Sequence, residues 1–380
     1  MGIVLYRKFR PKKFSEVIGQ KHIIKTLTNA ISKGLISHAY LFYGPRGCGK
    51  TTVARLLAKA INCEKRKENE FEPCNECPIC QEINEGRCLD LIEIDAASHR
   101  GIDEIRELKE GVKFSPTKAK YKVFILDEAH QLSKDAANAL LKTLEEPPPH
   151  AIFILATTEV HKMIPTILSR CQRFDFRKLT LSEILKKLEY ICQKEGIKIE
   201  KKALELIGAY SGGALRDAES LMDQIAIFSQ ALSREVKVED IKELLGLVEV
   251  PLIIKFVEFL GKEETISAIN FLTEISEKGI ELQEFNKSLI NYLRQMLILK
   301  IVKKRESLIS DSILKGLTRE EIGKLSKQSQ QFSLEKIQKM INLFIEAQNK
   351  MRYSPILQLP LEMAVVKICE NSTKLIDQKD

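Results

Sequence analysis

The sequence has 380 residues, of which 44% are hydrophobic and 29% charged, a composition that excludes a disordered chain and is typical of two or three folded domains. It lacks an apolar run of about 18 residues, and basic residues follow the first six positions at once, so we expect a cytoplasmic protein with no membrane partner. The net charge of +8 excludes a histone-like basic tail but favours polyanions, so we consider nucleic acid as a partner.

Five short β-branched or aromatic runs alternate with helical patterns between about Ala39 and Phe176. This alternation predicts an α/β fold in which a parallel sheet is covered by helices. The strands are expected at 39–43, 89–95, 122–128, 151–158 and 173–176.

The remainder of the sequence is predicted to be helical. Strand patterns stop near Lys178, and the helical patterns that follow are broken at Gly196 and at Gly212-Gly213. Beyond Pro251, apolar residues such as Ile266 recur at three- and four-residue steps, which predicts a further set of helices. We expect a first domain over 1–177, a small helical domain over 178–247, a third, helical domain over 248–369 and a disordered tail over 370–380.

A phosphate-binding loop is the most specific motif. "GPRGCGKTT" at 44–52 fits G-x-x-x-x-G-K-[ST] and lies between an expected strand and an expected helix. Successive N–H groups of such a loop point at a phosphate; Lys50 would bridge the β- and γ-phosphates, and Thr51 would hold Mg²⁺. A glycine turn that binds nothing is disfavoured because both flanks also fit. The predicted nucleotide-binding residues here are Gly44, Pro45, Arg46, Gly47, Cys48, Gly49, Lys50, Thr51 and Thr52, with the cysteine as a small filler rather than a nucleophile.

An acidic pair follows the apolar run "VFILDEAH" at 123–130. Asp127 fits the Mg²⁺ shell, and Glu128 fits the base that orients and deprotonates the attacking water. The alternative, two acids that merely cap a strand, is weakened by the phosphate loop upstream. The letters "DEAH" also occur in helicases, but the arginine-rich companion element of that class is absent.

Two further polar residues complete the predicted catalytic set, and a third, Arg216, joins the predicted nucleotide-binding residues. Thr157, at the end of "AIFILATT", would sense the γ-phosphate or hold the attacking water. Arg170, in "ILSRC", is expected at an exposed edge, where it is either an ordinary surface arginine or an arginine finger for a neighbouring subunit. Arg216 opens a later helix and would contact the γ-phosphate if that helix folds over the nucleotide.

Five cysteines lie between the phosphate-loop helix and the next expected strand. Cys74, Cys77 and Cys80 present three thiolates on a tight turn, and tetrahedral Zn²⁺ requires a fourth ligand. Cys63 and Cys88 are equally suitable by spacing alone. An iron–sulfur cluster is the alternative, although its usual spacing is not met after Cys80, and a disulfide is disfavoured in a reducing compartment.

The phosphate loop, "LDEAH", "ATT", "SRC" and "GALRDA" occur in an order that resembles the clamp-loader branch of the AAA+ ATPases. The resemblance is strong over about residues 1–245 and extends to "LYRKFRPKKFSEVIGQKHI" at 5–23 and to the segment from "NALLKTLEEPPP" to "RFDF". It implies that the second domain is an ATPase lid and the third an oligomerisation collar, that Cys63 is the fourth ligand of a structural zinc module over 63–80, and that the adenine pocket is formed by Arg10, Pro11, Val17 and Ile18.

The resemblance also implies a function. The chain would belong to a five-subunit ring that uses ATP binding and hydrolysis to load a sliding clamp onto primed DNA during replication, as part of a polymerase holoenzyme. DNA would be held by backbone contacts, for which Arg100 and Arg106 are candidates, with an ordinary helix surface as the alternative. No polymerase active site is visible, and an end at residue 380 suggests a short form or a truncated long form. The competing hypotheses are a DNA-translocating AAA+ motor and a non-hydrolysing scaffold.

Overall fold

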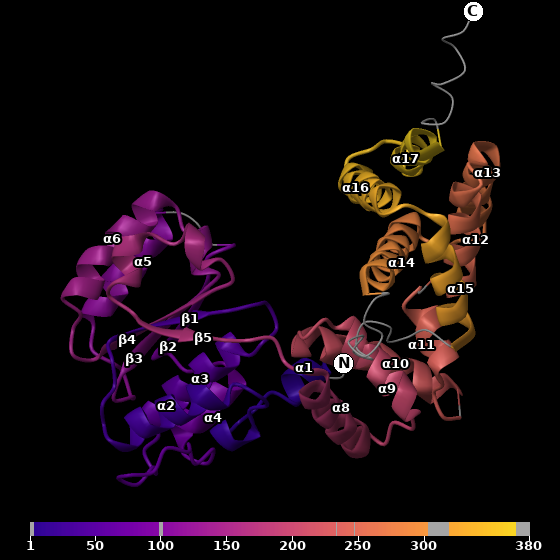
Figure 1. The fold of residues 1–380 in the computed structure, drawn as a ribbon. Helices are drawn as coiled ribbons and strands as arrows, with labels where there is room; N and C mark the ends of the chain where they lie inside the picture. The colour runs from indigo at the N-terminus through magenta and orange to yellow at the C-terminus, as the bar shows by residue number, and fades with distance from the viewer. Residues whose placement is uncertain (1–3, 99–101, 233, 247, 303–318, 370–380) are drawn as a thin grey trace, which may run out of the picture. The chain divides into compact units, whose positions relative to one another are not determined.

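The protein is described by a computed structural model that covers residues 4–98, 102–232, 234–246, 248–302 and 319–369 (Figure 1). The expected tail at 370–380 and Arg100 lie outside the described residues, as does the side chain of Arg106. The chain divides into two compact units, Met1–Val238 and Glu239–Asp380, and each is described by itself.

A five-stranded parallel sheet forms the centre of the first unit, with strand order β2-β3-β4-β1-β5. The predicted α/β fold and all five predicted strands are confirmed. Because the strands are parallel, the segments that follow β1, β3 and β4 all leave the sheet at one edge. The strands are β1 (Ala39–Tyr43), β2 (Leu91–Asp95), β3 (Lys122–Asp127), β4 (Ala151–Thr157) and β5 (Gln172–Asp175).

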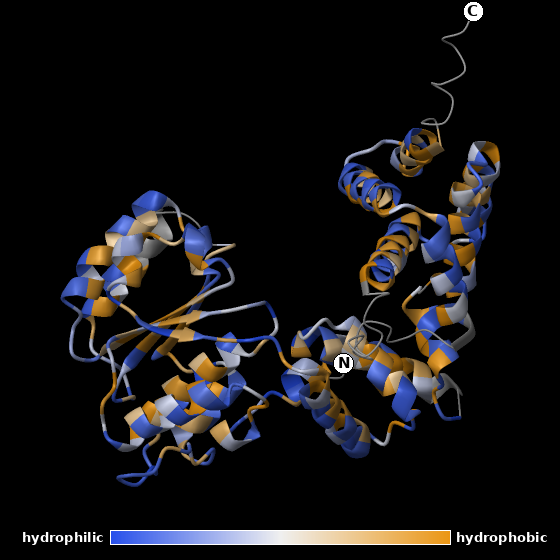
Figure 2. Ribbon diagram, in the orientation of Figure 1, coloured by the Kyte–Doolittle hydropathy of each residue, from blue (hydrophilic) through white to orange (hydrophobic). Residues whose placement is uncertain are grey.

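Helices cover both faces of this sheet (Figure 1). The helices α2 (Lys21–Ser32) and α3 (Lys50–Ile61) pack on one face, and α5 (Ile102–Lys113) and α6 (Lys134–Glu145) pack on the other. Successive residues of a strand point to opposite faces, so both faces of the central strands are apolar, as the hydropathy colouring in Figure 2 shows. In β1, for example, Phe42 packs toward α3 and Leu41 toward α6.

Shorter elements connect the sheet to its surroundings. The cysteine-rich segment ends in α4 (Pro78–Glu85), whose start is marked by a proline at its first position. The other short elements are α1 (Leu5–Lys8), α7 (Pro165–Leu168) and the 3₁₀ turns η1 (Phe14–Glu16), η2 (Ala129–Gln131) and η3 (Val160–Lys162).

Three longer helices complete the first unit: α8 (Leu181–Glu195), α9 (Lys201–Tyr210) and α10 (Leu215–Leu232). A capping box between Thr180 and Glu183 starts α8, and Gly196 ends it with φ of +69°. The expected helix breaks are therefore confirmed. The boundary expected near residue 178 falls inside this unit and stays a prediction. One further helix, α11 (Val238–Leu244), follows at the limit of the unit.

The second unit is helical, with a core built around four phenylalanines, Phe256, Phe271, Phe285 and Phe344. The expected repeat is only partly buried: Ile266 is 77% exposed because the buried stripe of its helix passes through Ala268, Phe271, Leu272 and Ile275. The helices are α12 (Val250–Gly261), α13 (Thr265–Glu277), α14 (Leu282–Val302), α15 (Arg319–Gln331), α16 (Leu334–Met351) and α17 (Leu359–Cys369).

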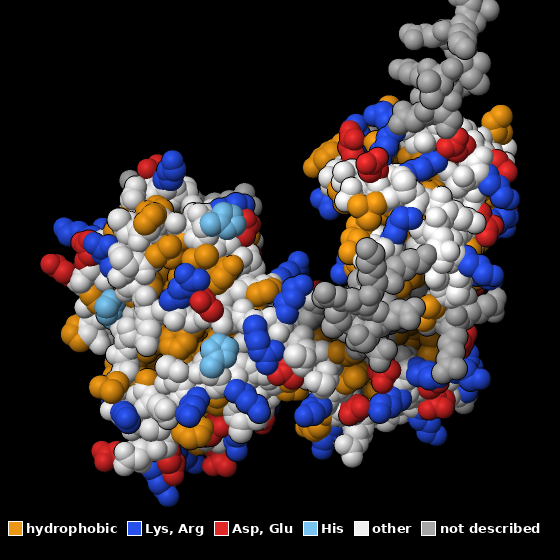
Figure 3. Space-filling model, in the orientation of Figure 1, with side chains coloured by type: hydrophobic (Ala, Val, Ile, Leu, Met, Phe, Trp, Pro, Cys, Tyr) orange, Lys and Arg blue, Asp and Glu red, His pale blue; other side chains and the backbone are white. Residues whose placement is uncertain are grey.

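The surface carries both signs of charge. In the view of Figure 3, basic and acidic side chains are interspersed over the surface of the second unit. Among the described helices, none is both long and apolar enough to span a bilayer.

Candidate functional site

The phosphate loop connects β1 to α3. A Cβ atom at Gly44 would lie 2.4 Å from the carbonyl oxygen of Phe176, so only glycine fits where the loop leaves the strand. Gly49 has φ of +101° at the N-cap of α3, a conformation that side chains rarely adopt. The loop therefore has the backbone path that the motif predicts, and the positive end of α3 opens into it.

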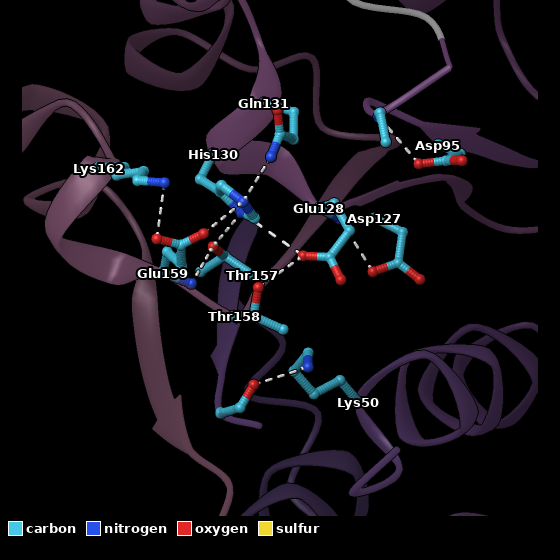
Figure 4. Close-up of polar contacts among 12 residues, drawn as sticks. Lys50, Asp95, Asp127, Glu128, His130, Gln131, Thr157, Thr158, Glu159 and Lys162 are labelled. Carbon is cyan, nitrogen blue, oxygen red and sulfur yellow. Dashed lines mark hydrogen bonds and ion pairs between the residues drawn. The ribbon is translucent and has the colours of Figure 1, made fainter. Parts of the chain in front are cut away.

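Lys50 lies inside this loop and is only 6% exposed. Its Nζ donates to the carbonyl oxygens of Gly44 (2.7 Å) and Pro45 (2.9 Å) (Figure 4). The Cys48 thiol also donates to Pro45, and burial raises its pKa. A thiol that stays protonated is a poor nucleophile, which agrees with its interpretation as a filler.

The acidic pair lies against the start of α3. The Thr51 hydroxyl donates to Asp127 Oδ2 (2.7 Å), and the Glu128 amide donates to Asp127 Oδ1 (2.9 Å). The two predicted Mg²⁺ ligands are thus adjacent, and both offer oxygen, the donor that Mg²⁺ prefers. Glu128 has φ of +48°, a rare conformation for a residue other than glycine. Its carboxylate contacts Thr158 and His130 (Figure 4).

The two threonines at the end of β4 have different surroundings. Thr158 donates to Glu128 Oε2 (3.0 Å), whereas Thr157 is fully buried, and its hydroxyl accepts from the Glu159 amide (3.1 Å) and lies 3.0 Å from His130 Nδ1. Thr157, the residue selected from the sequence, does not line the cavity. Thr158 was not selected, although the doubled threonine of "ATT" could have drawn attention to it.

His130 was also missed, and it connects the acidic pair to the segment after β4. Its side chain is 3% exposed; Nδ1 lies 3.5 Å from Glu128 Oε2, and Nε2 lies 3.4 Å from Glu159 Oε1. Glu159 in turn pairs with Lys162 at 2.8 Å. Figure 4 shows this chain of polar contacts running from Glu128 to η3.

A cavity of about 410 Å³ collects most of the predicted nucleotide-binding residues. Gly44, Pro45, Thr157 and Arg170 are not among its lining residues, and Tyr6, Asp95 and Glu219 line it although the sequence analysis did not select them. The predicted residues that line it are Arg10, Pro11, Val17, Ile18, Arg46, Gly47, Cys48, Gly49, Lys50, Thr51, Thr52, Asp127, Glu128 and Arg216.

The start of α10 closes one side of this cavity. The Leu215 amide donates to the Gly47 carbonyl (3.1 Å), so α10 is attached directly to the phosphate loop. The Arg216 guanidinium lies 5.0 Å from the centre of the Tyr6 ring, within the range of a cation–π contact. The structure thus brings Arg216 to the loop, as its proposed role requires.

Three arginines and one lysine line the cavity together with four acidic residues. Burial lowers the pKa of Arg10, and the nearby Arg55 and Arg216 lower it further. Burial raises the pKa of Glu219 to about 7, against the opposing effects of Lys187 and Arg10. The Nε atom of Arg55 is buried without a hydrogen-bond partner. Guanidinium groups that lower one another's pKa would be stabilised by an anionic ligand such as a nucleoside triphosphate.

Arg170 lies elsewhere in the first unit, just after α7. Its guanidinium donates to the carbonyl oxygen of Thr166 (2.6 Å) and pairs with Glu145 of α6. It is absent from the lining of the cavity, so it does not serve the nucleotide site of its own chain in this arrangement.

The structure groups four cysteines, Cys63, Cys74, Cys77 and Cys80, whose sulfur atoms all lie within 4.8 Å of one another. Cys88 lies outside this group, and all nine cysteines are free. Tetrahedral Zn²⁺ with Zn–S of about 2.3 Å requires sulfur separations of about 3.8 Å, and the Cys74 and Cys80 sulfurs lie 3.9 Å apart. The donor set therefore fits a single ion, since a larger iron–sulfur cluster would hold the thiolates further apart.

The electrostatics of the cluster also favour a cation. Burial raises the pKa of the Cys63 and Cys80 thiols. For Cys74, burial acts in the same direction, but the Glu76 and Cys77 amides outweigh it and lower the pKa to about 7. Buried thiolates require a compensating positive charge, which a bound metal ion provides.

Three family models together match nearly the whole chain. The model "DNA polymerase III, delta subunit" matches residues 19–180, "DNA polymerase III clamp loader subunit, ATPase lid domain" matches 183–231, and "DNA polymerase III subunits gamma and tau domain III" matches 236–379.

Curated relatives carry consistent names. DNA polymerase III subunit tau of Bacillus subtilis is 43% identical over 97% of this chain and 63% of its own length. Subunit gamma of Buchnera aphidicola subsp. Schizaphis graminum is 37% identical over 96% of this chain and 97% of its own. Subunit tau of Escherichia coli is 40% identical over 78% of this chain and 46% of its own length. The chain thus spans nearly all of a gamma subunit but less than two thirds of either tau subunit.

Among solved structures, Thermotoga maritima RuvB is similar over 66% of this chain and 79% of its own length, at 19% identity and a TM-score of 0.48. A likeness at this level carries no functional argument.

Proposed function

The chain belongs to the family of DNA polymerase III gamma and tau subunits, and from this premise we propose that it is an ATP-hydrolysing subunit of a clamp loader. The observation that carries the proposal is the arrangement of Lys50, Thr51 and Asp127 around one cavity, with Glu128 beside them. These are the groups that phosphoryl transfer to water requires, namely a phosphate-binding lysine, metal ligands and a base.

Each residue has a distinct role in the proposed reaction. The loop amides and Lys50 bind the β- and γ-phosphates, exchanging the carbonyl contacts of the lysine for phosphate oxygens. Thr51 and Asp127 would hold Mg²⁺, which neutralises developing negative charge when bound. Glu128 orients the attacking water and accepts its proton. The hydrogen bond from Thr158 sets the direction of the Glu128 carboxylate.

Two arginines are proposed to sense the γ-phosphate. Arg216 acts within its own chain, because α10 is attached to the phosphate loop through Leu215 and Gly47. Arg170 acts on a neighbouring subunit, because it follows α7 and lies outside the cavity of its own chain. An arginine supplied in this way stabilises the charge of the transition state and raises kcat by a factor of ~10³–10⁵.

The wider assembly is proposed from the family. The subunit would join others in a five-membered ring, with residues 178–247 as the lid and 248–369 as the collar. ATP binding favours the ring state that holds an open sliding clamp and primed DNA, and hydrolysis removes that preference. Since loading must occur at any sequence, DNA is held through its phosphates.

The cysteine cluster is proposed to bind structural zinc. Its four ligands, Cys63, Cys74, Cys77 and Cys80, leave no coordination position for a water molecule in a tetrahedral site. The ion would therefore stabilise the fold of the module rather than take part in hydrolysis.

The alternatives predict different outcomes in one experiment. The ATPase rate of the reconstituted ring is measured with and without the cognate clamp and primed DNA, together with clamp loading and strand separation. A loader shows stimulation by both components and loads clamps. Processive strand separation without clamp dependence would instead indicate a translocating motor. Absence of hydrolysis would indicate a scaffold, against which the intact Lys50, Asp127 and Glu128 argue.

A further inference from the structure

The cysteine-rich segment contacts the N-terminal segment that precedes α2. Both oxygens of the Glu72 carboxylate accept backbone amides: Oε2 from Phe14 and Oε1 from Ser15, each at 2.8 Å. Within the cysteine turn, Asn75 Nδ2 donates to the Lys12 carbonyl at 3.1 Å. The module therefore binds the backbone of this segment at Lys12, Phe14 and Ser15.

The same module is joined to the phosphate-loop helix. Lys59, near the end of α3 and 2% exposed, donates to Asn75 Oδ1 (2.6 Å) and to Asn84 Oδ1 (2.7 Å). Arg66 Nε donates to the Ala60 carbonyl (2.8 Å). Asn75 thus contacts Lys59 with its oxygen and Lys12 with its nitrogen. One short turn connects α3 to the N-terminal segment.

The position of these contacts along the chain matters for the cavity. Arg10 and Pro11, just before the held segment, and Val17 and Ile18, just after it, all line the nucleotide cavity. Between them, Phe14 is buried in the core beside α3. The contacts from Glu72 and Asn75 therefore lie between the two pairs of cavity residues.

We propose that the metal-binding module positions the base-binding side of the nucleotide cavity, with Glu72 as the positioning residue. Glu72 lies two residues before Cys74, so the ion that orders the cysteine turn also fixes the place of its carboxylate. A charged acceptor that bonds two successive amides prevents the segment from leaving its position. Without the ion, the cysteine-rich loop regains conformational freedom. The free energy of metal binding then no longer stabilises the contact between Glu72 and the N-terminal segment.

This inference rests on the proposed binding of ATP in this cavity and adds a role for the module. Removal of Glu72 should weaken the binding of the base but leave the phosphate loop intact, because the loop is held by other contacts, from the Gly44 amide to the Thr157 carbonyl and from the Leu215 amide to the Gly47 carbonyl. The contrast between a ligand with a base and one without it therefore separates the proposed effect from general damage.

The test uses the full chain loaded with zinc. The Kd values for ATP and for inorganic tripolyphosphate are measured by calorimetry for wild type, Glu72→Ala and Glu70→Ala, and bound zinc is quantified in each. Glu70 lies in the same loop, is exposed, and its carboxylate has no hydrogen-bond or ion-pair partner among the described residues. We expect Glu72→Ala to keep its zinc and its tripolyphosphate affinity but to bind ATP about five- to tenfold more weakly, and Glu70→Ala to match wild type.

A second set of measurements removes the zinc from wild type and from Glu72→Ala. Hydrogen exchange of a peptide covering residues 12–18 is followed with zinc bound and after chelation. We expect the Phe14 and Ser15 amides to be protected only in the zinc-loaded protein, and chelation to weaken ATP binding of wild type more than that of Glu72→Ala.

The inference is overturned if zinc-loaded Glu72→Ala binds ATP as wild type does, if both ligands weaken equally, or if chelation leaves the exchange of residues 12–18 unchanged. Failure of wild-type protein itself to bind ATP would overturn the proposed function instead.

Discussion

The Thr51 hydroxyl and the Asp127 carboxylate form a 2.7 Å hydrogen bond although 76 positions separate them in the sequence. The bond exists because β1 and β3 end at the same edge of the parallel sheet, with only β4 between them. It joins the start of the phosphate-loop helix, where Lys50 lies, to the acidic pair, so Lys50 and Glu128 line the same cavity.

The first prediction concerns Lys50. Replacement by alanine removes the ammonium group that lies inside the phosphate loop, so ATP binding should fall below detection in calorimetry. Lys33 is exposed and lies outside the cavity, so the control variant Lys33→Ala should bind ATP like wild type. Equal affinity of Lys50→Ala and wild type would remove the basis of the proposed function.

The second prediction separates the two threonines. Thr158→Val removes the hydrogen bond to Glu128, so kcat of the assembled ring should fall about tenfold with little change in the Kd for ATP. Thr157→Val removes a buried hydroxyl that accepts from Glu159 and contacts His130, so it should lower the free energy of unfolding by about 1–2 kcal/mol.

Both variants are compared by single-turnover kinetics and by denaturant unfolding. Valine has nearly the shape of threonine, which limits the change in packing. A slower chemical step in Thr157→Val, at undiminished stability, would restore the role that the sequence analysis assigned to Thr157.

The third prediction concerns Arg170. Arg170→Ala should leave ATP affinity unchanged but slow turnover in the assembled ring by about 10² or more, whereas the slow turnover of the isolated chain should not change. Glu145→Gln is the matched control, because it removes the ion pair of Arg170 and keeps the guanidinium. A ring that hydrolyses ATP at the wild-type rate without Arg170 would exclude a role in trans.

The fourth prediction is a pH dependence of stability. Burial raises the pKa of Glu219 to about 7 in the folded chain, above the value of about 4.3 for an exposed glutamate. Folding therefore favours the protonated form of Glu219. The stability that this form contributes is fully present below about pH 4 and is lost as the pH rises toward 7. Relative to Glu219→Gln, wild type should lose up to about 3 kcal/mol of unfolding free energy between pH 4.5 and 7.

Denaturant unfolding of both proteins across this range provides the measurement. Since all other titrating groups are shared, only the difference between the two curves is interpreted. Parallel curves would show that Glu219 is already ionised in the folded chain.

The fifth prediction identifies the fourth zinc ligand. Cys63→Ser should lose tightly bound zinc and lower the thermal unfolding temperature, because three thiolates cannot complete the tetrahedral site. Cys88→Ser should retain one zinc per chain, since Cys88 lies outside the cluster. Zinc content measured by mass spectrometry distinguishes the two candidates. Loss of zinc in Cys88→Ser but not in Cys63→Ser would identify Cys88 as the fourth ligand.

Much of the fold could be predicted because the signals are local. Alternation of apolar runs and glycine breaks predicted every strand of the sheet and the ends of α8 and α9. The phosphate loop was equally readable, because successive amides of one short segment, with Lys50 beside them, form the binding surface. In contrast, the exposed Ile266 shows that apolar spacing alone does not tell which side of a helix is buried.

Residue roles that depend on the orientation of a side chain or on partners far away in the sequence could not be predicted. Thr157 and Thr158 are adjacent and chemically identical, and only the fold shows that Thr158 is the one that donates to Glu128. The contact of Glu72 with Phe14 spans 58 positions, and no local pattern pairs them.

By itself, therefore, the sequence determined the element order, the phosphate loop, the acidic pair and the cysteine turn, since each arises from neighbours along the chain. The spacing of the cysteines left Cys63 and Cys88 open, and the structure places Cys63 in the cluster, as the family resemblance implied. Only the tertiary structure decided that Thr158 meets Glu128 and that Glu72 holds the N-terminal segment. These choices follow from long-range packing, in which the sheet and α3 bring together residues whose separation along the chain carries no information about their distance in space.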